Sequence, residues 1–465
     1  MASAAPSKTQ RIRDPLHGLI VFKVNDDVDP VAWRLLNSRE MQRLRRIRQL
    51  GFSDLIYPGA THSRLAHSIG VYHTARNLVR LIEDQVDKVD EHRRRVVLLA
   101  ALLHDVGHGP FSHAFEGATA KAGMAKDHED WSADIILGDT EVHAILDQAD
   151  PKIAEDIARL LKEEEPKDIF ATIVSSQFDA DRLDYLQRDR LMTGVQFGHL
   201  DQDWLFDCLR VGKVTVGTDD PFDADCLYLS TKGRRVAEEY LEARHRLYVM
   251  VYMHKTTRGA EKILEHLLKL FSSDVREGRI TPSNFPGSQL LKFFSTTEPP
   301  LKAYIGLDDS VIWAELGRMA EELNGEIAEL ADRLRSRRLF KCFDVAEKLG
   351  GKPPGNIRLR FKKALREAGG IPYLEDDYAL SPYKAYDFDS PSALSKVLVK
   401  EHDSDAQPTG IETQSPVIRA ITERESRSIG YTSQIRRSSL SLRKFGRRSH
   451  NEHREVSDRD RRATC

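Results

Sequence analysis

The sequence predicts a mainly α-helical protein that carries a smaller α+β C-terminal lobe and a disordered tail. Apolar residues recur at helical spacing through long stretches, of which residues 234–271 form the longest. Only two short stretches, residues 211–216 and 227–229, predict strands. From about Glu401 the composition shifts to Ser, Arg, Glu and Gln, which cannot bury enough apolar surface to order a chain.

The individual elements follow in chain order. Residues 11–24 predict an extended segment with a turn at Asp14 and Pro15. Residues 30–50 predict a helix with Trp33 and Leu36 on its apolar side. Further helices are expected at residues 71–86, 96–103, 151–165, 166–177, 234–271 (with a break near 256–259) and 308–338.

Composition excludes several classes of protein. The chain has 465 residues, for which two or three structural units are expected, and 70 basic against 72 acidic residues give no global field that favours nucleic acid. The cysteines form neither a metal motif nor a disulfide framework, which indicates a reducing, cytoplasmic environment. These are Cys208, Cys226, Cys342 and Cys465. Residues 1–10 lack the apolar core of a signal peptide, and we expect no contact with a membrane.

Residues 103–113 hold three histidines and an aspartate. The apolar run 96–103 predicts a buried helix that leads directly into this stretch. His104 and His108 are four residues apart, so they would share one face of a helix. Imidazole and carboxylate together suit a divalent metal, namely Mn, Fe, Ni, Zn or Mg. A buried charge is costly unless it is coordinated, which favours a metal site over an ordinary helix end.

Two other segments supply the missing ligands. His67 precedes the central helix, and Asp181 follows it in a stretch rich in acids. The order His, His-Asp, Asp along the chain is the signature of the HD phosphohydrolases. The sequence therefore predicts His67, His104, Asp105 and Asp181 as metal ligands.

Residues 11 to about 255 resemble the HD-domain deoxynucleoside triphosphate triphosphohydrolases. The likeness is strongest to the type that vertebrates carry behind a sterile-alpha-motif domain, and to its bacterial relatives. The matching stretches are collinear, at residues 14–18, 42–45, 49–51, 58–64, 67–71, 103–113, 128–129 and 179–189. We expect no sterile-alpha-motif domain before Arg11. The resemblance implies the helical HD-domain fold over residues 11–215, a C-terminal lobe over 216–400 and a disordered basic tail over 401–465.

The resemblance also implies roles for individual residues. His113 and His128 would contact the phosphate bridge and move protons, because the pKa of histidine lies near working pH. His113 would assist the leaving oxygen. Glu116 stands where the family usually has Asp, so its orienting role would be displaced. The implied catalytic residues are His108, His113, Glu116 and His128. The implied substrate contacts are of three kinds. Arg64 and Arg182 would contact phosphate, Gln49, Tyr185 and Asp189 would contact the sugar, and Arg244, Tyr252 and His254 match positions near the triphosphate and sugar.

Several of these residues have a plainer interpretation. Arg64 taken alone would be an ordinary surface residue, and Arg244, Tyr252 and His254 could equally form a charged and aromatic helix face. Arg182 stands where a phosphate-binding Lys is common, which replaces a point charge by a planar fork.

A regulatory guanine-nucleotide site is implied at Gln42 and Arg45. The acid that reads guanine in the family is replaced here by Asn37. An amide presents one accepting atom where a carboxylate can accept two N–H bonds, so we expect weak selectivity for guanine. The alternative is that Arg43, Arg45 and their basic neighbours form a solvated face.

The tail carries a cluster of basic residues between Arg436 and Arg448. A solvated tail is favoured over an arm that binds nucleic acid or a membrane surface. A chain ending near Lys400 is expected to stay folded and to keep its catalytic rate.

The sequence favours a metal-dependent phosphohydrolase that converts a dNTP to deoxynucleoside and triphosphate. It is expected to form a homo-oligomer, as a dimer or tetramer. One alternative is another HD phosphohydrolase that acts on nucleoside monophosphates or cyclic nucleotides. A second is a nucleotide-sensing protein that binds nucleic acid. Base preference, metal and activator stay open.

Overall fold

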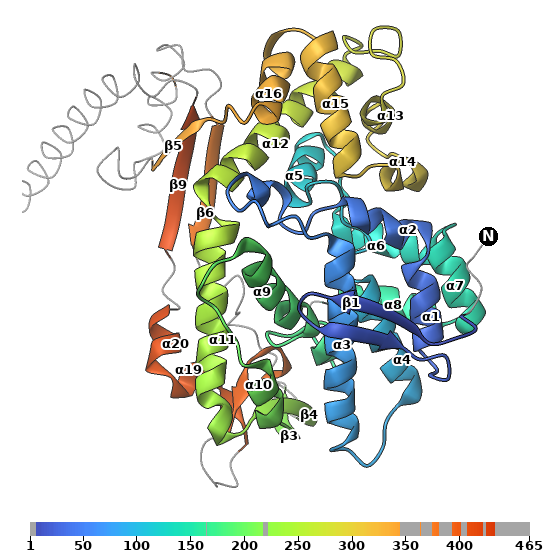
Figure 1. The fold of residues 1–465 in the computed structure, drawn as a ribbon, viewed down its shortest axis with the longest axis vertical. Coiled ribbons are helices and arrows are strands. Elements are labelled where there is room, and N and C mark those ends of the chain that lie inside the picture. The colour runs from blue at the N-terminus through green and yellow to red at the C-terminus, as the bar shows by residue number, and fades with distance from the viewer. Residues whose placement is uncertain are drawn as a thin grey trace, which may run out of the picture.

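The described part of the chain is mostly helical, which confirms the predicted fold class (Figure 1). The computed structural model describes residues 6–163, 165–216, 222–344, 363, 374–380, 393–400, 407–421 and 425–432. Within these residues, no helix combines the length and the apolar character needed to cross a bilayer.

The chain begins with an antiparallel hairpin. Strands β1 (Gln10–Asp14) and β2 (Gly18–Phe22) pair in the register Ile12 to Ile20, which buries Ile20 and Phe22 against the first helices. The prediction of a single helix over residues 30–50 is wrong. This part of the chain forms α1 (Asp29–Leu36), α2 (Arg39–Arg43) and the turns η1 (Leu44–Arg46) and η2 (Gly51–Leu55). The physical reason is Ser38, whose hydroxyl accepts from the Met41 N–H and starts a new helix.

The long helices α3 (Arg64–Glu83) and α4 (Glu91–Leu103) pack side by side, and α9 (Ala180–Thr193) lies against α3. Between α4 and α9 the chain forms α5 (His113–Lys121), α6 (His128–Leu137), α7 (Glu141–Ala149) and α8 (Ile153–Lys162). The helix expected over residues 166–177 is wrong, since only the short turn η3 (Ala171–Ile173) forms there. Asp168 accepts from the Ala171 N–H, a local bond that competes with a continuous helix.

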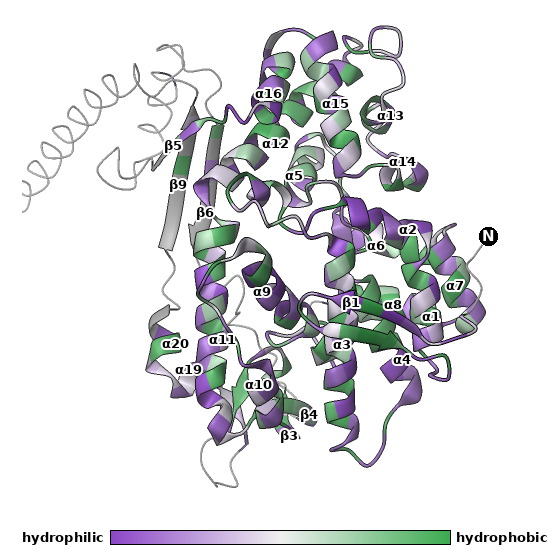
Figure 2. Cartoon of the chain, viewed as in Figure 1, coloured by the Kyte–Doolittle hydropathy of each residue, from purple (hydrophilic) through white to green (hydrophobic). Residues whose placement is uncertain are grey.

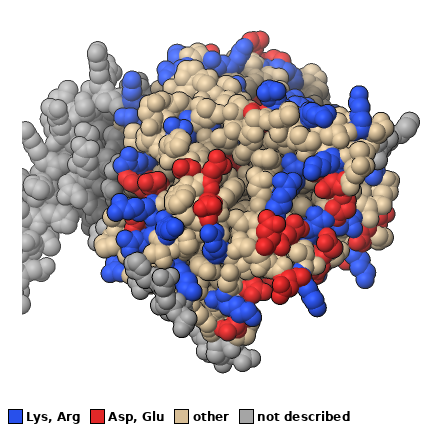
Figure 3. All heavy atoms as spheres, turned by 60° about the horizontal axis from the view of Figure 1, so that its bottom comes forward, with Lys and Arg blue, Asp and Glu red and all other residues tan. Residues whose placement is uncertain are grey.

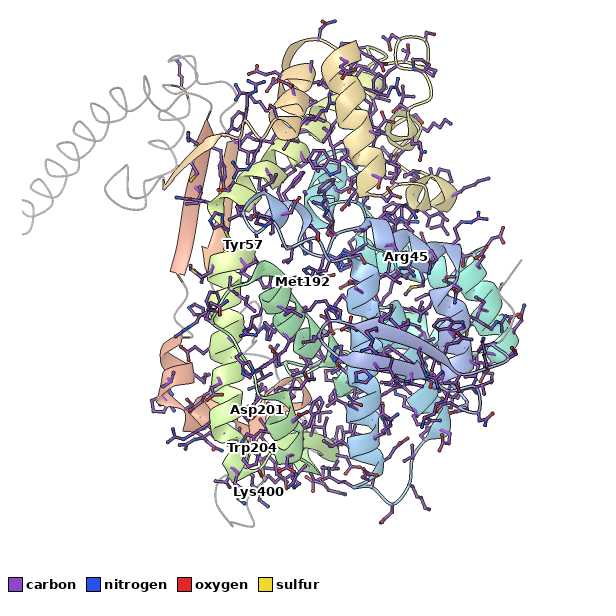
Figure 4. All side chains as sticks on the ribbon, viewed as in Figure 1. Arg45, Tyr57, Met192, Asp201, Trp204 and Lys400 are labelled. Atoms are coloured by element: carbon purple, nitrogen blue, oxygen red, sulfur yellow. The ribbon has the colours of Figure 1, made fainter. Side chains whose placement is uncertain are left out.

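A four-stranded sheet follows α10 (Gln202–Cys208), which Asp201 caps by accepting from the Trp204 N–H (Figure 4). Its order is β3 (Leu209–Val216), β4 (Phe222–Leu229), β7 (Leu398–Val399) and β8 (Thr409–Gly410). Antiparallel β3 and β4 confirm the two expected strands, and the short turns η4 (Thr231–Gly233) and η6 (Ala393–Ser395) flank the sheet.

The helix expected over residues 234–271 breaks earlier than predicted. It comprises α11 (Arg234–Leu247), a π-helical turn η5 (Tyr248–Tyr252) and α12 (Lys255–Arg276), whose apolar side is buried (Figure 2). The break falls at residues 253–254, because His254 caps α12 by accepting from the Thr256 N–H.

The C-terminal lobe packs on α12. It contains α13 (Gln289–Phe294), α14 (Leu301–Ile305), α15 (Asp309–Glu322) and α16 (Gly325–Arg335), so the expected helix over 308–338 is two helices. A three-stranded sheet adds β5 (Lys341–Asp344), β9 (Glu425–Thr432) and β6 (Leu374–Leu380), in that order.

The start of the disordered tail at residue 401 is wrong for residues 409–421 and 425–432. They form β8, the helices α19 (Ile411–Gln414) and α20 (Pro416–Ile421), and β9, which is the central strand of its sheet. Ile411, Ile418 and Tyr431 are fully buried, and this burial is the physical reason for their order. The basic cluster between Arg436 and Arg448 lies outside the described residues.

Two hydrophobic cores organise the described chain. One joins β2, α1, α3, α4 and helices α6 to α11, together with Ile411 and Ile418. The other joins α5, α12, α15 and α16 with Tyr431 of β9. The cores meet near the break before α12, and the domain boundary at residue 216 stays a prediction.

Candidate metal centre and active site

Three separate elements converge on one point. His67 lies on α3, His104 directly follows α4, and Asp181 lies in the first turn of α9. One nitrogen of each histidine and one carboxylate oxygen all lie within 4.8 Å of one another. His67 Nε2 is 2.8 Å from Asp181 Oδ1 and 3.3 Å from His104 Nε2. Two imidazole nitrogens and a carboxylate oxygen form a donor set that fits a divalent first-row metal.

Local sequence explains this convergence. The Ser63 hydroxyl starts α3 by accepting from the Ala66 N–H, and Asp179 starts α9 by accepting from the Arg182 N–H. All residues of α4 from Val96 to Leu103 are buried, so this helix carries the polar residue that follows it deep into the protein.

Asp105 lies beside the three converging side chains. Its Oδ1 is 3.4 Å from His104 Nε2, and its Oδ2 accepts from Arg64 Nη1 at 2.6 Å. Burial raises the pKa of Asp105, but the charges of Arg64 and His104 outweigh it and hold that pKa well below its usual range. The carboxylate is therefore ionised next to the centre, and its role as a fourth ligand stays a prediction.

Carboxylates dominate the electrostatics of the centre. Burial lowers the pKa of His67, but hydrogen bonds to Asp181 and Asp184 outweigh it and raise the pKa to about 10. Burial also opposes the charged form of His104, whose pKa is nevertheless raised, first by Asp105. The surroundings thus favour positive charge at this point, which a bound cation would provide.

The predicted catalytic residues gather between α5 and α6. His108 does not share a helical face with His104 as expected, because α4 ends at Leu103 and the chain turns. Its ring instead stacks on His128, with centroids 4.2 Å apart. Glu116 lies between two imidazoles, 3.4 Å from Nδ1 of His113 and 3.4 Å from Nδ1 of His128. His108, Glu116 and His128 line one small cavity, while the His113 side chain is 72% exposed.

The loop before α5 is strained and strongly held. Phe111 and Ser112 have φ of 52° and 48°, which costs about 1–3 kcal/mol for each residue without glycine's freedom. The Phe111 N–H donates to Asp309 at 2.8 Å, and its ring stacks on Phe52 at 4.2 Å. Arg64 donates to the Ser112 hydroxyl through Nε and Nη2. These contacts fix the start of α5, on which His113 and Glu116 lie.

The residues with an implied sugar contact lie next to the centre. The Tyr252 hydroxyl donates to Asp189 Oδ2 at 2.8 Å, and the Tyr185 ring lies 6.1 Å from Tyr252 and 6.5 Å from His67. Gln49 Oε1 is buried without a hydrogen-bond partner in the part of the chain that the structure describes. This amide oxygen is thus available to a ligand.

The arginines with an implied phosphate contact are all held by protein groups. Arg182 donates to the Ser176 carbonyl at 2.9 Å and pairs with Asp179. Arg244 is buried and donates to Gln177 Oε1 at 2.8 Å. Arg64 is buried too, so its interpretation as a surface residue is wrong.

His254 lies apart from this group. It caps α12, and its ring lies 6.2 Å from the ring of Tyr57 (Figure 4). Its implied contact with substrate stays a prediction.

The implied regulatory residues lie around α1 and α2. Asn37 donates to the Trp33 carbonyl at 2.7 Å, and Arg45 donates to Gln42 Oε1 at 2.7 Å (Figure 4). The interpretation of Arg43 as part of a solvated face is wrong. Arg43 is 2% exposed and donates to the Leu307 carbonyl, because its side chain fills the space under α14.

Comparison with known proteins agrees with this geometry. The protein-family model described as HD domain matches residues 64–188, from the start of α3 into α9. An uncharacterized Bacillus subtilis protein, YwfO, is 35% identical over 337 residues, which cover 72% of each chain. The chain belongs to the HD-domain phosphohydrolase family.

Two further proteins are similar at lower identity. A Dictyostelium discoideum protein named deoxynucleoside triphosphate triphosphohydrolase SAMHD1 homolog is 28% identical over 72% of this chain, and the match spans 60% of that relative. A phosphohydrolase crystal structure from Bacteroides thetaiotaomicron superposes with a TM-score of 0.73 at 24% identity, over 92% of this chain and all of the other. The likeness to the Bacteroides thetaiotaomicron structure concerns the fold alone.

Sequence reasoning missed several side chains at this HD centre. His62 Nε2 lies 2.6 Å from Asp189 Oδ1, and His17 and Arg188 both contact Asp184. One signal was present, because Asp184 and Arg188 are four residues apart and form an ion pair on α9. His17 contacts a residue 167 positions away, which no local pattern indicates.

The contact between Glu116 and His128 predicts a change in pH dependence. Burial lowers the pKa of His128, but the hydrogen bond to Glu116 outweighs it and raises the pKa. If protonated His128 delivers a proton to the leaving oxygen, activity is lost as pH rises through this pKa. Glu116→Gln is therefore expected to move the alkaline limb of the kcat/KM profile to lower pH.

The matched control is Glu129→Gln. Glu129 acts on His128 by its charge and not by a hydrogen bond, so a smaller shift is expected. An alkaline limb that is unchanged in Glu116→Gln would contradict the assignment of His128 as the proton donor.

Proposed function

We propose that the protein is a metal-dependent phosphohydrolase that converts a dNTP and water to a deoxynucleoside and triphosphate. The observation that carries the proposal is the convergence of His67, His104 and Asp181 from three elements, beside the aromatic pair Tyr185 and Tyr252. The printed name of the Dictyostelium relative, a deoxynucleoside triphosphate triphosphohydrolase, supports the choice of substrate.

The proposed ligands are His67, His104 and Asp181, with Asp105 beside them. A divalent metal bound there, whether Mn, Fe, Mg, Ni or Zn, supplies Lewis-acid activation of water. The His104 Nδ1–H donates to the Ala101 carbonyl at 2.9 Å, which leaves the Nε2 lone pair directed at the centre.

The chain's own groups bind the triphosphate and move its protons. Arg64, Arg182 and Arg244 offer guanidinium forks that match phosphate oxygens and absorb negative charge as it develops. Hydrogen bonds to His113 and His128 lower the pKa of Glu116, so this carboxylate is ionised and orients both imidazoles. We assign the proton for the leaving deoxynucleoside oxygen to His128, which Glu116 keeps protonated, in place of His113, whose side chain is 72% exposed.

The proposed sugar site supports a preference for deoxynucleotides as part of the proposal. Both Asp189 oxygens already accept a hydrogen bond, from His62 and Tyr252, and each retains a second lone pair for a sugar hydroxyl. A Tyr185 ring packed under the sugar leaves little room for a 2′-hydroxyl.

Product analysis tests the proposal. Purified protein is incubated in turn with each dNTP, each NTP, nucleoside monophosphates and cyclic nucleotides, with Mn or Mg, and the products are resolved by ion exchange. Release of intact triphosphate from dNTPs is expected. Orthophosphate as the sole product would indicate a general phosphatase. Turnover of monophosphates or cyclic nucleotides alone would indicate another HD phosphohydrolase. No turnover under any nucleotide mixture would indicate a nucleotide sensor.

Activation by nucleotides provides a separate prediction. Gln42 and Arg45 are present, but Asn37 replaces the expected acid and uses its amide N–H on the Trp33 carbonyl. We therefore expect GTP and dGTP to activate no more strongly than ATP, dATP and dTTP at equal concentration. The rate of dNTP hydrolysis with each added nucleotide measures this, and a much stronger response to GTP would contradict it.

Assembly and nucleic-acid binding also belong to this proposal. We expect a homo-oligomer, as a dimer or tetramer.

The face drawn in Figure 3 interleaves acidic and basic side chains. It therefore lacks the field of one sign that steers nucleic acid to a surface.

A further inference from the structure

Asp184 is a completely buried carboxylate that receives four hydrogen bonds. Its Oδ2 accepts from His67 Nδ1 at 2.8 Å and from Arg188 Nε at 2.8 Å. Its Oδ1 accepts from His17 Nε2 at 2.6 Å and from Arg188 Nη2 at 2.9 Å. The Asp184 side chain is 0% exposed, so its charge is satisfied entirely by these protein groups.

The partners of Asp184 are themselves fixed. Arg188 is 1% exposed and also donates to Asp14 Oδ2 at 2.8 Å. Asp14 Oδ1 accepts from the backbone N–H groups of Leu16 and His17 at 2.9 Å each, which closes the turn between β1 and β2. The N-terminal hairpin is thereby joined to α9 through buried charges.

Helices α3 and α9 approach closely at this point. A Cβ atom added to Gly70 would lie 1.9 Å from Asp184 Oδ1 and 2.4 Å from Arg188 Nη2. Only glycine fits there, so the backbone of α3 also keeps the carboxylate in place under His67, one turn earlier in the same helix.

This geometry determines how His67 faces the centre. Because Nδ1 donates its proton to Asp184, Nε2 is the nitrogen that remains to bind a metal, and it faces His104 and Asp181. His104 is held in the same sense by a neutral carbonyl, that of Ala101, whereas His67 is held by a charged group. A carboxylate in this place orients a histidine ligand and raises its basicity.

We propose that Asp184, held by Arg188, His17 and Asp14, is the positioning residue that orients His67 as a metal ligand. This inference rests on the proposed metal centre. It gives the β1–β2 hairpin, which contributes no metal ligand, a direct part in metal affinity.

Asp29 offers a matched control on the other side of α3. It is 2% exposed and accepts from the Tyr72 hydroxyl at 2.7 Å, from Arg76 Nη1 at 3.0 Å and from the Lys23 N–H at 2.8 Å. It matches Asp184 in burial and in its pairing with a buried arginine, but contacts none of the proposed ligands among the described residues.

The test is a Co²⁺ titration of the full chain, followed by visible absorption, for wild type, Asp184→Asn, His17→Ala and Asp29→Asn. Asp184→Asn is expected to bind Co²⁺ about 10- to 100-fold more weakly and with altered band intensities, because His67 is no longer held. His17→Ala should show a smaller loss in the same direction. Asp29→Asn should lower the Tm without changing Co²⁺ affinity.

Equal Co²⁺ affinity in wild type and Asp184→Asn would overturn the inference. Equal losses in Asp184→Asn and Asp29→Asn would do the same, because the effect would then be general destabilisation. If Asp184→Asn does not fold, His17→Ala decides the question, and an unchanged affinity there contradicts the proposal. A wild-type chain that binds no Co²⁺, or a His104→Ala chain that binds it normally, would instead refute the metal centre itself.

Discussion

His104→Ala is expected to remove the bound metal and to reduce dNTP hydrolysis by at least about a thousandfold. A catalytic metal contributes several kcal/mol to the transition state, and about 1.4 kcal/mol is a factor of ten in rate. The fold should survive, because the side chain gives up one hydrogen bond, to the Ala101 carbonyl, and two longer contacts, to Asp105 at 3.4 Å and Asp181 at 3.6 Å. Metal content and kcat/KM, measured on the same sample, test this.

His143→Ala is the matched control for His104→Ala. His143 Nδ1 contacts the Ile136 carbonyl at 3.0 Å, which is the same kind of bond in a helix remote from the centre. Its replacement should leave metal content and rate unchanged. Full metal content and a rate near wild type in His104→Ala would mean that the metal site is wrongly assigned.

Asp105→Ala is less suited to this purpose. Arg64 is buried and donates to Asp105 at 2.6 Å, so removing the carboxylate leaves a buried charge unpaired. Such a loss typically costs about 3–5 kcal/mol, which would confuse lost folding with lost catalysis.

A chain that ends at Lys400 is expected to lose its folded C-terminal lobe, contrary to the interpretation from sequence. The truncation removes β9, which pairs with β6 over Glu425–Tyr431 and with β5 over Ile429–Thr432. It also removes Ile411 and Ile418, whose burial alone contributes about 3–6 kcal/mol. That is a large part of the roughly 5–15 kcal/mol by which a typical domain is stable.

The control for this truncation is a chain that ends at Thr432. It keeps both sheets and lacks the Arg436–Arg448 cluster, so it should match the full chain in Tm and in turnover of free nucleotide. Any nucleic-acid binding by that cluster should be lost in this chain. Equal Tm values for the chains ending at Lys400 and Thr432 would contradict the structural role of β9.

The proposed ligands were accessible from sequence because chemistry restricts them to few residue types. His67, His104 and Asp181 come from distant segments, yet each lies beside neighbours that match a known family. The positions of His108 and Ser38 were not accessible in this way. His108 leaves the face of His104 because α4 ends at Leu103. Ser38 caps a new helix although the apolar periodicity of the sequence continues unbroken there.

Contacts between remote residues account for most of the remaining differences. His17 meets Asp184 across 167 residues, and Phe111 with positive φ is held by Asp309 across 198. Neither contact leaves a local pattern. Strand β9 is mostly polar in sequence and becomes ordered because two distant strands pair with it and Tyr431 is buried. Its composition alone therefore indicated disorder.

The most direct test of the central claim is where water enters the products. Hydrolysis of one dNTP in water enriched in heavy oxygen, with the metal that supports the fastest rate, is followed by mass spectrometry. The proposed reaction cleaves the bond between the α-phosphorus and the 5′-oxygen, so one heavy oxygen should appear in intact triphosphate and none in the deoxynucleoside. Heavy oxygen in orthophosphate or pyrophosphate, with no labelled triphosphate, would contradict the proposed function.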